Sequence, residues 1–180
     1  MGKIILNLAA SLDGFIAEEN GSVDWLNDFL QPAEDYGMKL FFEQCGTAIM
    51  GAKTYEQTLS FNYWYGNMDG IVFTSRDLPS LEGRSVQFIA GNPTEIVKVL
   101  REKTKDSWLV GGASLIAQFI NKGLLDELII TIVPRLIGKG IPLCADLNGI
   151  QKLKLEETKT YKDGVVQLKY LTIGSPEFLQ

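Results

Sequence analysis

The chain has 180 residues, 46% of them hydrophobic, which is enough for one substantial core and too few for two ordinary domains. Its formal net charge is −5 at pH 7 without a long basic run, which argues against a nucleic-acid or anionic-membrane surface and favours a small-molecule partner. No apolar stretch reaches the roughly 18 residues of a membrane span, and the first residues show no signal-peptide pattern. We therefore expect a cytoplasmic protein that does not bind membranes.

The sequence contains no histidine, which excludes Ser-His-Asp and Cys-His triads, HExxH zinc sites and a histidine general acid. The two cysteines, Cys45 and Cys144, are far apart and lack CxxC spacing, so we interpret them as reduced buried thiols and expect no metal site. Proton transfer must then use Asp, Glu, Tyr, Lys, Cys or water.

The first part of the chain predicts one strand and two helices. The apolar run at 3–10 is typical of a central strand. After the SLDG turn, residues 21–30 indicate a loop entering a short helix, with Ser22 or Asp24 as its cap. Pro32 is expected to open a longer helix that runs to about Gln44, because proline needs no N–H donor in the first turn and acidic residues follow it.

Strands and helices alternate in the rest of the chain. Residues 95–103 form an amphipathic helix in which Ile96, Val99 and Leu100 share the apolar face. Further strands are predicted at 47–51, 70–74, 86–90, 107–110 and 126–133, further helices at 52–59 and 113–122, and a closing antiparallel hairpin at 153–161 and 165–172. This order predicts an α/β fold: a mixed, mostly parallel central sheet of about eight strands with helices on both faces.

We expect a single domain over residues 1–173. Residues 174–180 break the apolar pattern and are interpreted as a tail, either native or left by expression. Ligands of open α/β sheets bind beyond the carboxyl ends of the strands, so the points where strands pass into helices are the places to search for a site.

Three such points could hold phosphate groups. In MGAKTYE, Gly51 precedes a helix whose first turn carries Lys53 and Thr54; the alternative is a tight turn with a solvated lysine. In TSR, two hydroxyls and a guanidinium could hold a phosphate monoester, or form a surface turn. In LVGGASLI, paired glycines would let a pyrophosphate approach the backbone at a helix start. None is a Rossmann or P-loop motif.

Together, SLDGFIA, MGAKTYE, VFTSR and LVGGASLI, in that order, resemble the dihydrofolate reductase-like superfamily. The closest resemblance is to the C-terminal reductase domain of the bacterial bifunctional deaminase-reductase of riboflavin biosynthesis, and it spans nearly the whole chain. The resemblance implies a three-layer fold and an NADPH-dependent oxidoreductase, such as 5-amino-6-(5-phosphoribosylamino)uracil reductase or dihydrofolate reductase. It also suggests a homodimer, with 126–133 and VPRLIGKGIPL as a pairing edge; the alternative is a buried strand in a monomer.

The resemblance also implies where the cofactor binds. Relatives usually show Gly-Arg-Lys-Thr where this chain has Gly-Ala-Lys-Thr, and the missing arginine leaves NADH as an alternative to NADPH, with Lys53 and Arg76 as candidate replacements. Residues implied to contact phosphate, adenosine, pyrophosphate or nicotinamide are Ala9, Ala10, Ile16, Gly51, Lys53, Thr54, Thr74, Ser75, Arg76, Val110, Gly111, Gly112, Ala113, Ser114 and Leu115.

For the substrate, the resemblance implies an acidic residue early in the first long helix. Asp35 takes that place, with Glu34 adjacent, and it would protonate the substrate if burial raised its pKa; the alternative is an ordinary acid at a helix start. Further candidates for the substrate pocket are Asp13, Trp25, Asp28, Tyr36 and Phe41, although Trp25 and Phe41 fit a plain core position better.

The substrate itself stays open at this point. The segment after Trp25 lacks the basic residues that would hold a ribose phosphate, and no arginine after MGAKTYE suits a glutamate tail. We expect hydride transfer to a small heterocyclic or sugar-like substrate. The alternative is a non-catalytic protein that keeps the fold to bind a nucleotide or another small ligand.

Overall fold

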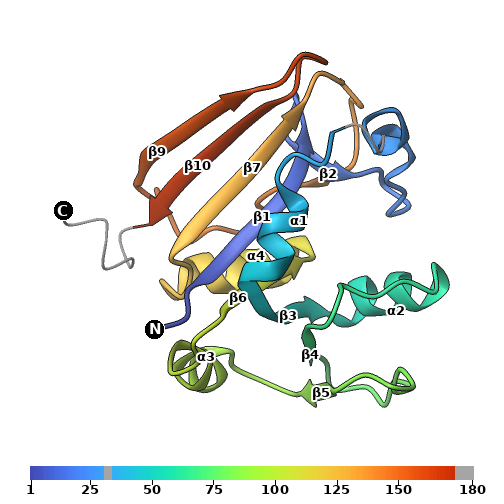
Figure 1. Cartoon of the computed structure of the whole chain (residues 1–180), viewed down its shortest axis with the longest axis vertical. Helices are drawn as coiled ribbons and strands as arrows, with labels where there is room; N and C mark the ends of the chain where they lie inside the picture. Colours follow the sequence, from blue (N-terminus) through green and yellow to red (C-terminus); the bar gives the residue numbers. More distant parts are fainter. Residues whose placement is uncertain (31–33, 173–180) are drawn as a thin grey trace.

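The computed structural model, which describes residues 1–30 and 34–172, is built on one large sheet (Figure 1). Its eight strands lie in the order β5-β4-β3-β6-β1-β7-β10-β9. All neighbours from β5 to β7 are parallel, whereas β10 is antiparallel to both β7 and β9. The predicted mixed sheet and closing hairpin are confirmed. The strands are β1 (Ile4–Ser11), β3 (Cys45–Gly51), β4 (Asp69–Phe73), β5 (Val86–Ile89), β6 (Asp106–Gly111), β7 (Glu127–Val133), β9 (Leu153–Thr160) and β10 (Val166–Thr172).

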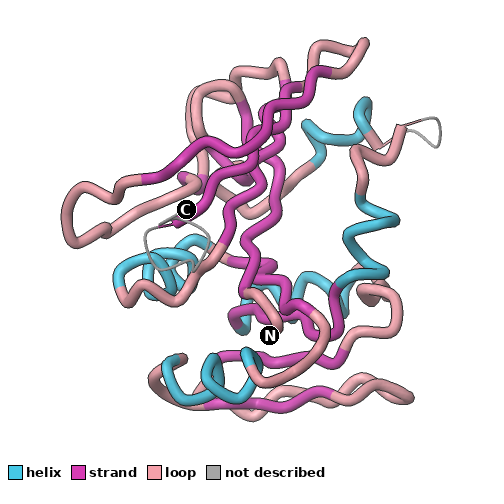
Figure 2. Tube along the Cα trace, turned by 60° about the vertical axis from the view of Figure 1, so that its left-hand side comes forward, coloured by secondary structure: helices cyan, strands magenta, loops and turns pink. Residues whose placement is uncertain are grey.

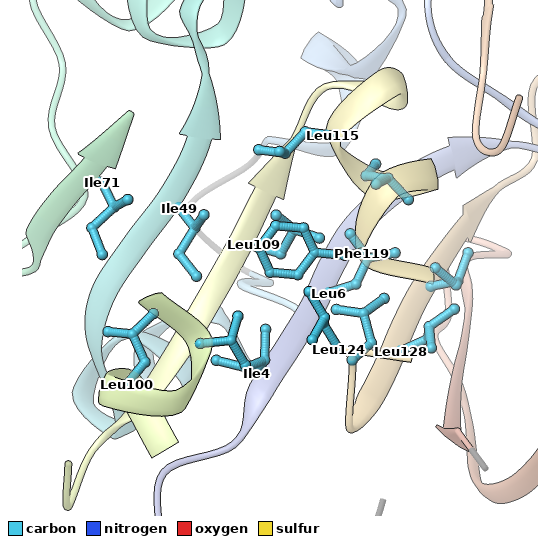
Figure 3. Packing of buried hydrophobic residues seen from close by; sticks show 14 of the residues in the cluster. Ile4, Leu6, Ile49, Ile71, Leu100, Leu109, Leu115, Phe119, Leu124 and Leu128 are labelled. Carbon is cyan, nitrogen blue, oxygen red and sulfur yellow. The ribbon is translucent and has the colours of Figure 1, made fainter. Parts of the chain in front are cut away.

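Helices cover both faces of this sheet, as predicted (Figure 2). Side chains alternate along a strand, so Ile4 and Leu6 enter one core while Ile5 enters the other. The first core holds α3 (Thr94–Arg101) and α4 (Ala113–Asn121) against the sheet, and Phe119 of α4 lies over the strands in Figure 3. The second core holds α1 (Met38–Gln44) and α2 (Ala52–Ser60). The result is a three-layer α/β architecture.

A second, two-stranded sheet was not expected from the sequence. Its strands β2 (Phe15–Ala17) and β8 (Ile141–Pro142) are antiparallel and very short. The 3₁₀ helix η1 (Asp24–Phe29) follows β2, where a short helix was predicted. Periodicity needs several residues to be recognised, which is why two- and three-residue strands are not visible in the sequence.

The first long helix was predicted to open near Pro32, and this is wrong within the described residues: α1 begins at Met38. Pro32 itself lies outside the described residues. Tyr36 and Gly37 have φ angles of 50° and 79°, and two left-handed residues in succession cannot continue a right-handed helix. The side chain of Asp35 instead accepts hydrogen bonds from the backbone N–H groups of Gly37 and Lys39, forming a turn before the helix.

Two further expectations are corrected by packing. Val99 was placed on the apolar face of its helix, but its side chain is 53% exposed, and Val97 and Leu100 are the buried residues of α3. The segment 126–133 was considered as a dimer edge, but β7 is hydrogen-bonded to β1 on one side and β10 on the other. The segment 126–133 is therefore an internal strand of the sheet and is not its exposed edge. Within 1–30 and 34–172, no helix is both long and apolar enough to cross a membrane.

Candidate functional site

The candidate site is a groove of about 1410 Å³ at the carboxyl ends of the parallel strands. β3 and β6 are neighbours in the sheet, with Met50 paired to Gly111 at the end of their ladder. α2 and α4 begin directly after these two strands and pack on opposite faces of the sheet. Both helix starts therefore open into the same groove, which is the position at which open α/β sheets bind ligands.

The two helix starts supply hydrogen-bond donors. The N-cap residues are Gly51 for α2 and Gly112 for α4, and neither helix receives a side-chain cap. The first N–H groups of a helix have no partner inside the helix, and the helix dipole favours negative charge there. Lys53 lies in the first turn of α2 and lines the groove. This combination of backbone donors and one ammonium group suits a pyrophosphate.

The turn between β6 and α4 requires glycine. Gly111 has a φ angle of 124°, a conformation that other residues rarely adopt, and its peptide bond to Gly112 is cis. A Cβ atom on Gly112 would lie 3.6 Å from Oγ1 of Thr54, which belongs to α2. The two helix starts are thus close together.

One charged pair occupies the side of the groove. Arg76, which follows β4, donates two hydrogen bonds of 2.9 Å each to the carboxylate of Glu56 on α2. These hydrogen bonds lower the pKa of the Glu56 carboxyl. The guanidinium predicted to contact a phosphate therefore already has an anionic partner, although both side chains remain accessible to solvent. Glu56 was not among the predicted site residues.

Most of the residues implied for the cofactor do line this groove. They come from β1, β2, the end of β6, the α2 start, the segment after β4 and the α4 start, and they are Ala9, Ile16, Gly51, Lys53, Thr54, Arg76, Val110, Gly112, Ala113, Ser114 and Leu115. The others lie outside the lining. Ala10 is buried in the core, and Gly111 forms the turn before α4. The Thr74 hydroxyl accepts a hydrogen bond from the backbone N–H of Arg76, with Ser75 between them in the sequence.

Asp35 does not line the groove. Its carboxylate is exposed, and the hydrogen bonds from the backbone N–H groups, first that of Gly37 and then that of Lys39, lower its pKa. A proton donor needs a raised pKa, so the environment of Asp35 acts in the opposite direction. Its neighbour Glu34 is exposed too and accepts a hydrogen bond from the N–H of Tyr36. The expected helical, desolvated position of this acid is not found.

The five residues proposed for the substrate pocket do not line the groove either. Asp13 accepts hydrogen bonds from the Ser11 hydroxyl and from two backbone N–H groups of the loop at 137–138. Asp28 forms an ion pair with Arg135. Asp13 therefore links the β1–β2 segment to the loop after β7, and Asp28 links η1 to the same loop.

The three aromatic candidates lie elsewhere in the fold. Phe41 is a core residue packed edge-on against Trp108, at 5.7 Å between ring centroids. The hydroxyl of Tyr36 donates a hydrogen bond to Asp163 in the β9–β10 turn, and burial raises the pKa of Tyr36 to about 12. Trp25 is half-buried, and its indole N–H has no hydrogen-bond partner in the described part of the chain.

An aromatic wall on the groove was missed. Phe61, Tyr63 and Tyr65 follow α2 and line the groove together with Thr58. The sequence did carry a signal: FNYWY is the densest aromatic cluster in the chain and directly follows a helix that begins at a predicted site. This signal alone does not indicate a site, because aromatic residues near a helix end are usually part of the core, as Trp64 is here.

The charged side chains of the groove are few and of both signs. Among residues 1–30 and 34–172, no group of three or more Cys, Asp or Glu side chains is arranged to hold a metal ion. The acidic side chains in the groove lining are Glu19 and Glu56, and the basic ones are Lys53 and Arg76. The site therefore offers anion-binding groups, apolar surface and hydroxyls.

The family of RibD C-terminal domains matches residues 2–167. The chain is 37% identical over 172 residues to YwjB, an uncharacterised protein of Bacillus subtilis (strain 168), covering 94% of this chain and 97% of YwjB. A protein of Shewanella sp. PV-4 provisionally assigned to riboflavin biosynthesis has a similar structure, with a TM-score of 0.84, 28% identity and coverage of 94% and 98%. Dihydrofolate reductase of Enterococcus faecalis, complexed with NADP(H), shares the fold at a TM-score of 0.66 and 17% identity, with coverage of 96% and 97%.

Proposed function

The chain belongs to the family of RibD C-terminal domains, and from that premise we propose that it is an NADPH-dependent reductase acting on a small heterocyclic or sugar-like substrate. The observation that carries the proposal is the groove between the uncapped starts of α2 and α4, at the carboxyl ends of β3 and β6. Two nearby helix starts suit the two phosphates of a dinucleotide better than a single anion.

The residues present fit a nicotinamide dinucleotide. The backbone N–H groups after Gly51 and Gly112 would hold the pyrophosphate, with Lys53 adding a charge. Ala9 and Ile16 give the groove small apolar surface near the end of β1, where a nicotinamide ring would be shielded from water. Bound NADPH would supply a hydride, and the protein would position the acceptor and exclude water.

Asp35 has no part in this proposal, because its exposed carboxylate lies outside the groove lining and has a lowered pKa. We propose that solvent water supplies the proton at the open side of the groove. We propose NADPH rather than NADH because the guanidinium of Arg76 is suited to bind the 2′-phosphate that only NADPH carries. To do so, Arg76 would exchange its ion pair with Glu56 for one with the phosphate.

The test is a titration of NADPH and NADH into the purified protein, followed by nicotinamide fluorescence. The Lys53→Ala variant should weaken the binding of both nucleotides, and Arg76→Ala should weaken NADPH selectively. Lys122→Ala is the matched control, because Lys122 is exposed and lies outside the groove lining. If neither nucleotide binds at sub-millimolar concentration, the reductase proposal is wrong. Binding without turnover of any heterocyclic substrate would favour the alternative of a non-catalytic ligand-binding protein.

We further propose that the protein is a homodimer. The pairing edge cannot be β7, so the candidate is β9, one of the two outermost strands, whose residues are all exposed. Leu153 and Leu155 on this strand are 42% and 52% exposed. A long exposed edge with apolar side chains is a site for strand association. Light scattering should give twice the chain mass, and Leu155→Lys should shift the protein to monomer; a wild-type monomer would contradict the proposal.

A further inference from the structure

The two ends of the groove differ in chemistry. The phosphate-binding groups lie at the start of α2, whereas Thr58 and the aromatic wall of Phe61, Tyr63 and Tyr65 lie at its end. A helix of this length places its ends roughly 13 Å apart. The groove volume of about 1410 Å³ also exceeds the roughly 1,000 Å³ of a typical single-ligand site. The aromatic end therefore has room for a second molecule beside a dinucleotide.

Two rings of the aromatic wall, those of Tyr63 and Tyr65, are held in place by neighbouring rings. Tyr65 packs edge-on against Trp108 of β6 at 4.9 Å between ring centroids, and Tyr63 packs edge-on against Tyr65 at 5.3 Å. Tyr63 is nevertheless 47% exposed. Part of its surface thus stays available to a planar ligand, while its orientation is supported by packing.

The hydrogen bonds at this end have a definite direction. The Thr58 hydroxyl donates its single proton to the backbone carbonyl of Thr54, at 2.9 Å. At the 3.1 Å contact between Thr58 Oγ1 and the Tyr65 hydroxyl, the Tyr65 O–H must then be the donor. The phenol oxygen of Tyr65 keeps its lone pairs for another donor. Burial raises the pKa of Tyr65, so this oxygen is an uncharged acceptor.

The basic side chains of the described groove lining belong to other segments than the aromatic wall. The basic side chains of the described lining are Lys53, at the α2 start, and Arg76, which is paired with Glu56. Lys139 lies in a neighbouring hollow that it shares with Glu18 and Glu19, whose carboxylates oppose an anionic ligand. Residues 31–33 and 173–180 contain no lysine or arginine. In the described groove lining, a phosphate or carboxylate on the ligand would meet no unpaired basic side chain beside the aromatic wall; the guanidinium of Arg84, which lies outside the lining, donates a hydrogen bond to the carbonyl oxygen of Gly66.

We propose that the aromatic end of the groove binds an uncharged heteroaromatic ring, which stacks on Tyr63 and donates a ring N–H to the phenol oxygen of Tyr65. This inference rests on the proposed reductase function and narrows its substrate to rings without a phosphate or carboxylate substituent. It departs from the phosphoribosyl substrate that the family resemblance suggests.

The test uses two matched pairs of compounds, each differing by one charged group: riboflavin with its 5′-phosphate, and lumazine with its 6-carboxylate. Binding is measured by ligand fluorescence quenching in the presence of saturating NADP⁺, so that no turnover occurs. We expect the uncharged member of each pair to bind about tenfold more tightly, because a desolvated charge without a partner is costly. Equal or tighter binding of the charged members, or no binding of either uncharged compound, would overturn the inference.

Variants separate this inference from the proposed function. Tyr65→Phe removes the acceptor oxygen and should lower the affinity for the uncharged ligands about three- to tenfold, without changing the affinity for NADPH. Tyr161→Phe is the matched control, because Tyr161 lies outside the groove lining. If Tyr65→Phe leaves ligand affinity unchanged, the assigned hydrogen bond is wrong. Failure of the wild-type protein to bind NADPH would instead contradict the proposed reductase function.

Discussion

Arg76 and Glu56 form a two-fold hydrogen-bonded ion pair across the side of the groove, with both N···O distances at 2.9 Å. The two residues are twenty positions apart and come from different elements, the segment after β4 and helix α2. An ion pair at this position competes with any anion that the guanidinium could bind. The strength of 2′-phosphate recognition should therefore depend on Glu56 as much as on Arg76.

Glu56→Gln should raise NADPH affinity. The substitution keeps the size of the side chain and removes the charge that competes for Arg76. Exposed ion pairs are worth about 0.2–1 kcal/mol, so we expect a gain of about two- to fivefold for NADPH and no gain for NADH. Fluorescence titration measures both, with Glu82→Gln, an exposed acid outside the groove lining, as control. An unchanged ratio of the two affinities would show that Arg76 does not contact the 2′-phosphate.

Gly111→Ala should destabilise the protein and impair nucleotide binding. At a φ angle of 124°, a Cβ atom costs about 1–3 kcal/mol, and relief of that strain would move the backbone between β6 and α4. Gly51→Ala is the control at the neighbouring helix start, where φ is −84° and an added Cβ lies 4.0 Å from its nearest neighbour. Urea unfolding should separate the two variants, and an equal loss of stability would contradict the argument from φ. NADPH titration then compares Gly111→Ala with the wild type, because Gly51 itself lines the groove.

Asp126→Ala should lower the free energy of unfolding by about 3–5 kcal/mol. Asp126 is 3% exposed, and its carboxylate accepts hydrogen bonds from the N–H of Ile4 at 2.8 Å and from Arg101 at 2.9 Å. Its removal leaves the Arg101 guanidinium, which is mostly buried, without its partner.

The control for this substitution is Glu95→Ala. It breaks the exposed pair with Lys98 on α3 and should cost at most about 1 kcal/mol. Chemical unfolding midpoints with m-values measure both variants. If Asp126→Ala lowers the free energy of unfolding as little as the control does, the buried ion pair contributes little to stability.

Asp13 should make the β1–β2 segment sensitive to acid. The hydrogen bond from the Ser11 hydroxyl, followed by those from the backbone of Gly138 and Ile137, lowers the pKa of Asp13 below its ordinary 3.8. A lowered pKa means that the unfolded chain binds the proton more tightly, so the stabilisation is present above about pH 4 and is lost as the pH falls through the lower, folded value.

Thermal unfolding at a series of pH values tests this dependence. Asp13→Asn should lower the Tm at neutral pH and reduce the loss of stability between about pH 5 and pH 3. Asp24→Asn is the control, because Asp24 is exposed in η1 and no side-chain hydrogen bond to its carboxylate is found in the described part of the chain. Parallel curves for the wild type and Asp13→Asn would contradict the prediction.

The sequence alone determined the sheet, the helices on both of its faces and the edge at which the groove lies. This is possible because buried residues recur along the chain with the period of a strand or a helix. In addition, the carboxyl ends of neighbouring parallel strands necessarily lie at one edge of the sheet. For the same reason the sequence predicts that the segments around Gly51 and Gly112 lie in one region. Short elements, such as β2 and β8, carry too few residues for a period to appear.

The tertiary structure decided which side chains face the groove. Asp35 was expected in a helix, but left-handed residues at Tyr36 and Gly37 place it in an exposed turn. The pairing of Arg76 with Glu56 and the contact of Tyr65 with Thr58 depend on how α2 packs on the sheet. Such contacts depend on side-chain packing between separate elements. Local sequence periodicity predicts which residues are buried, but it does not predict which residues they contact.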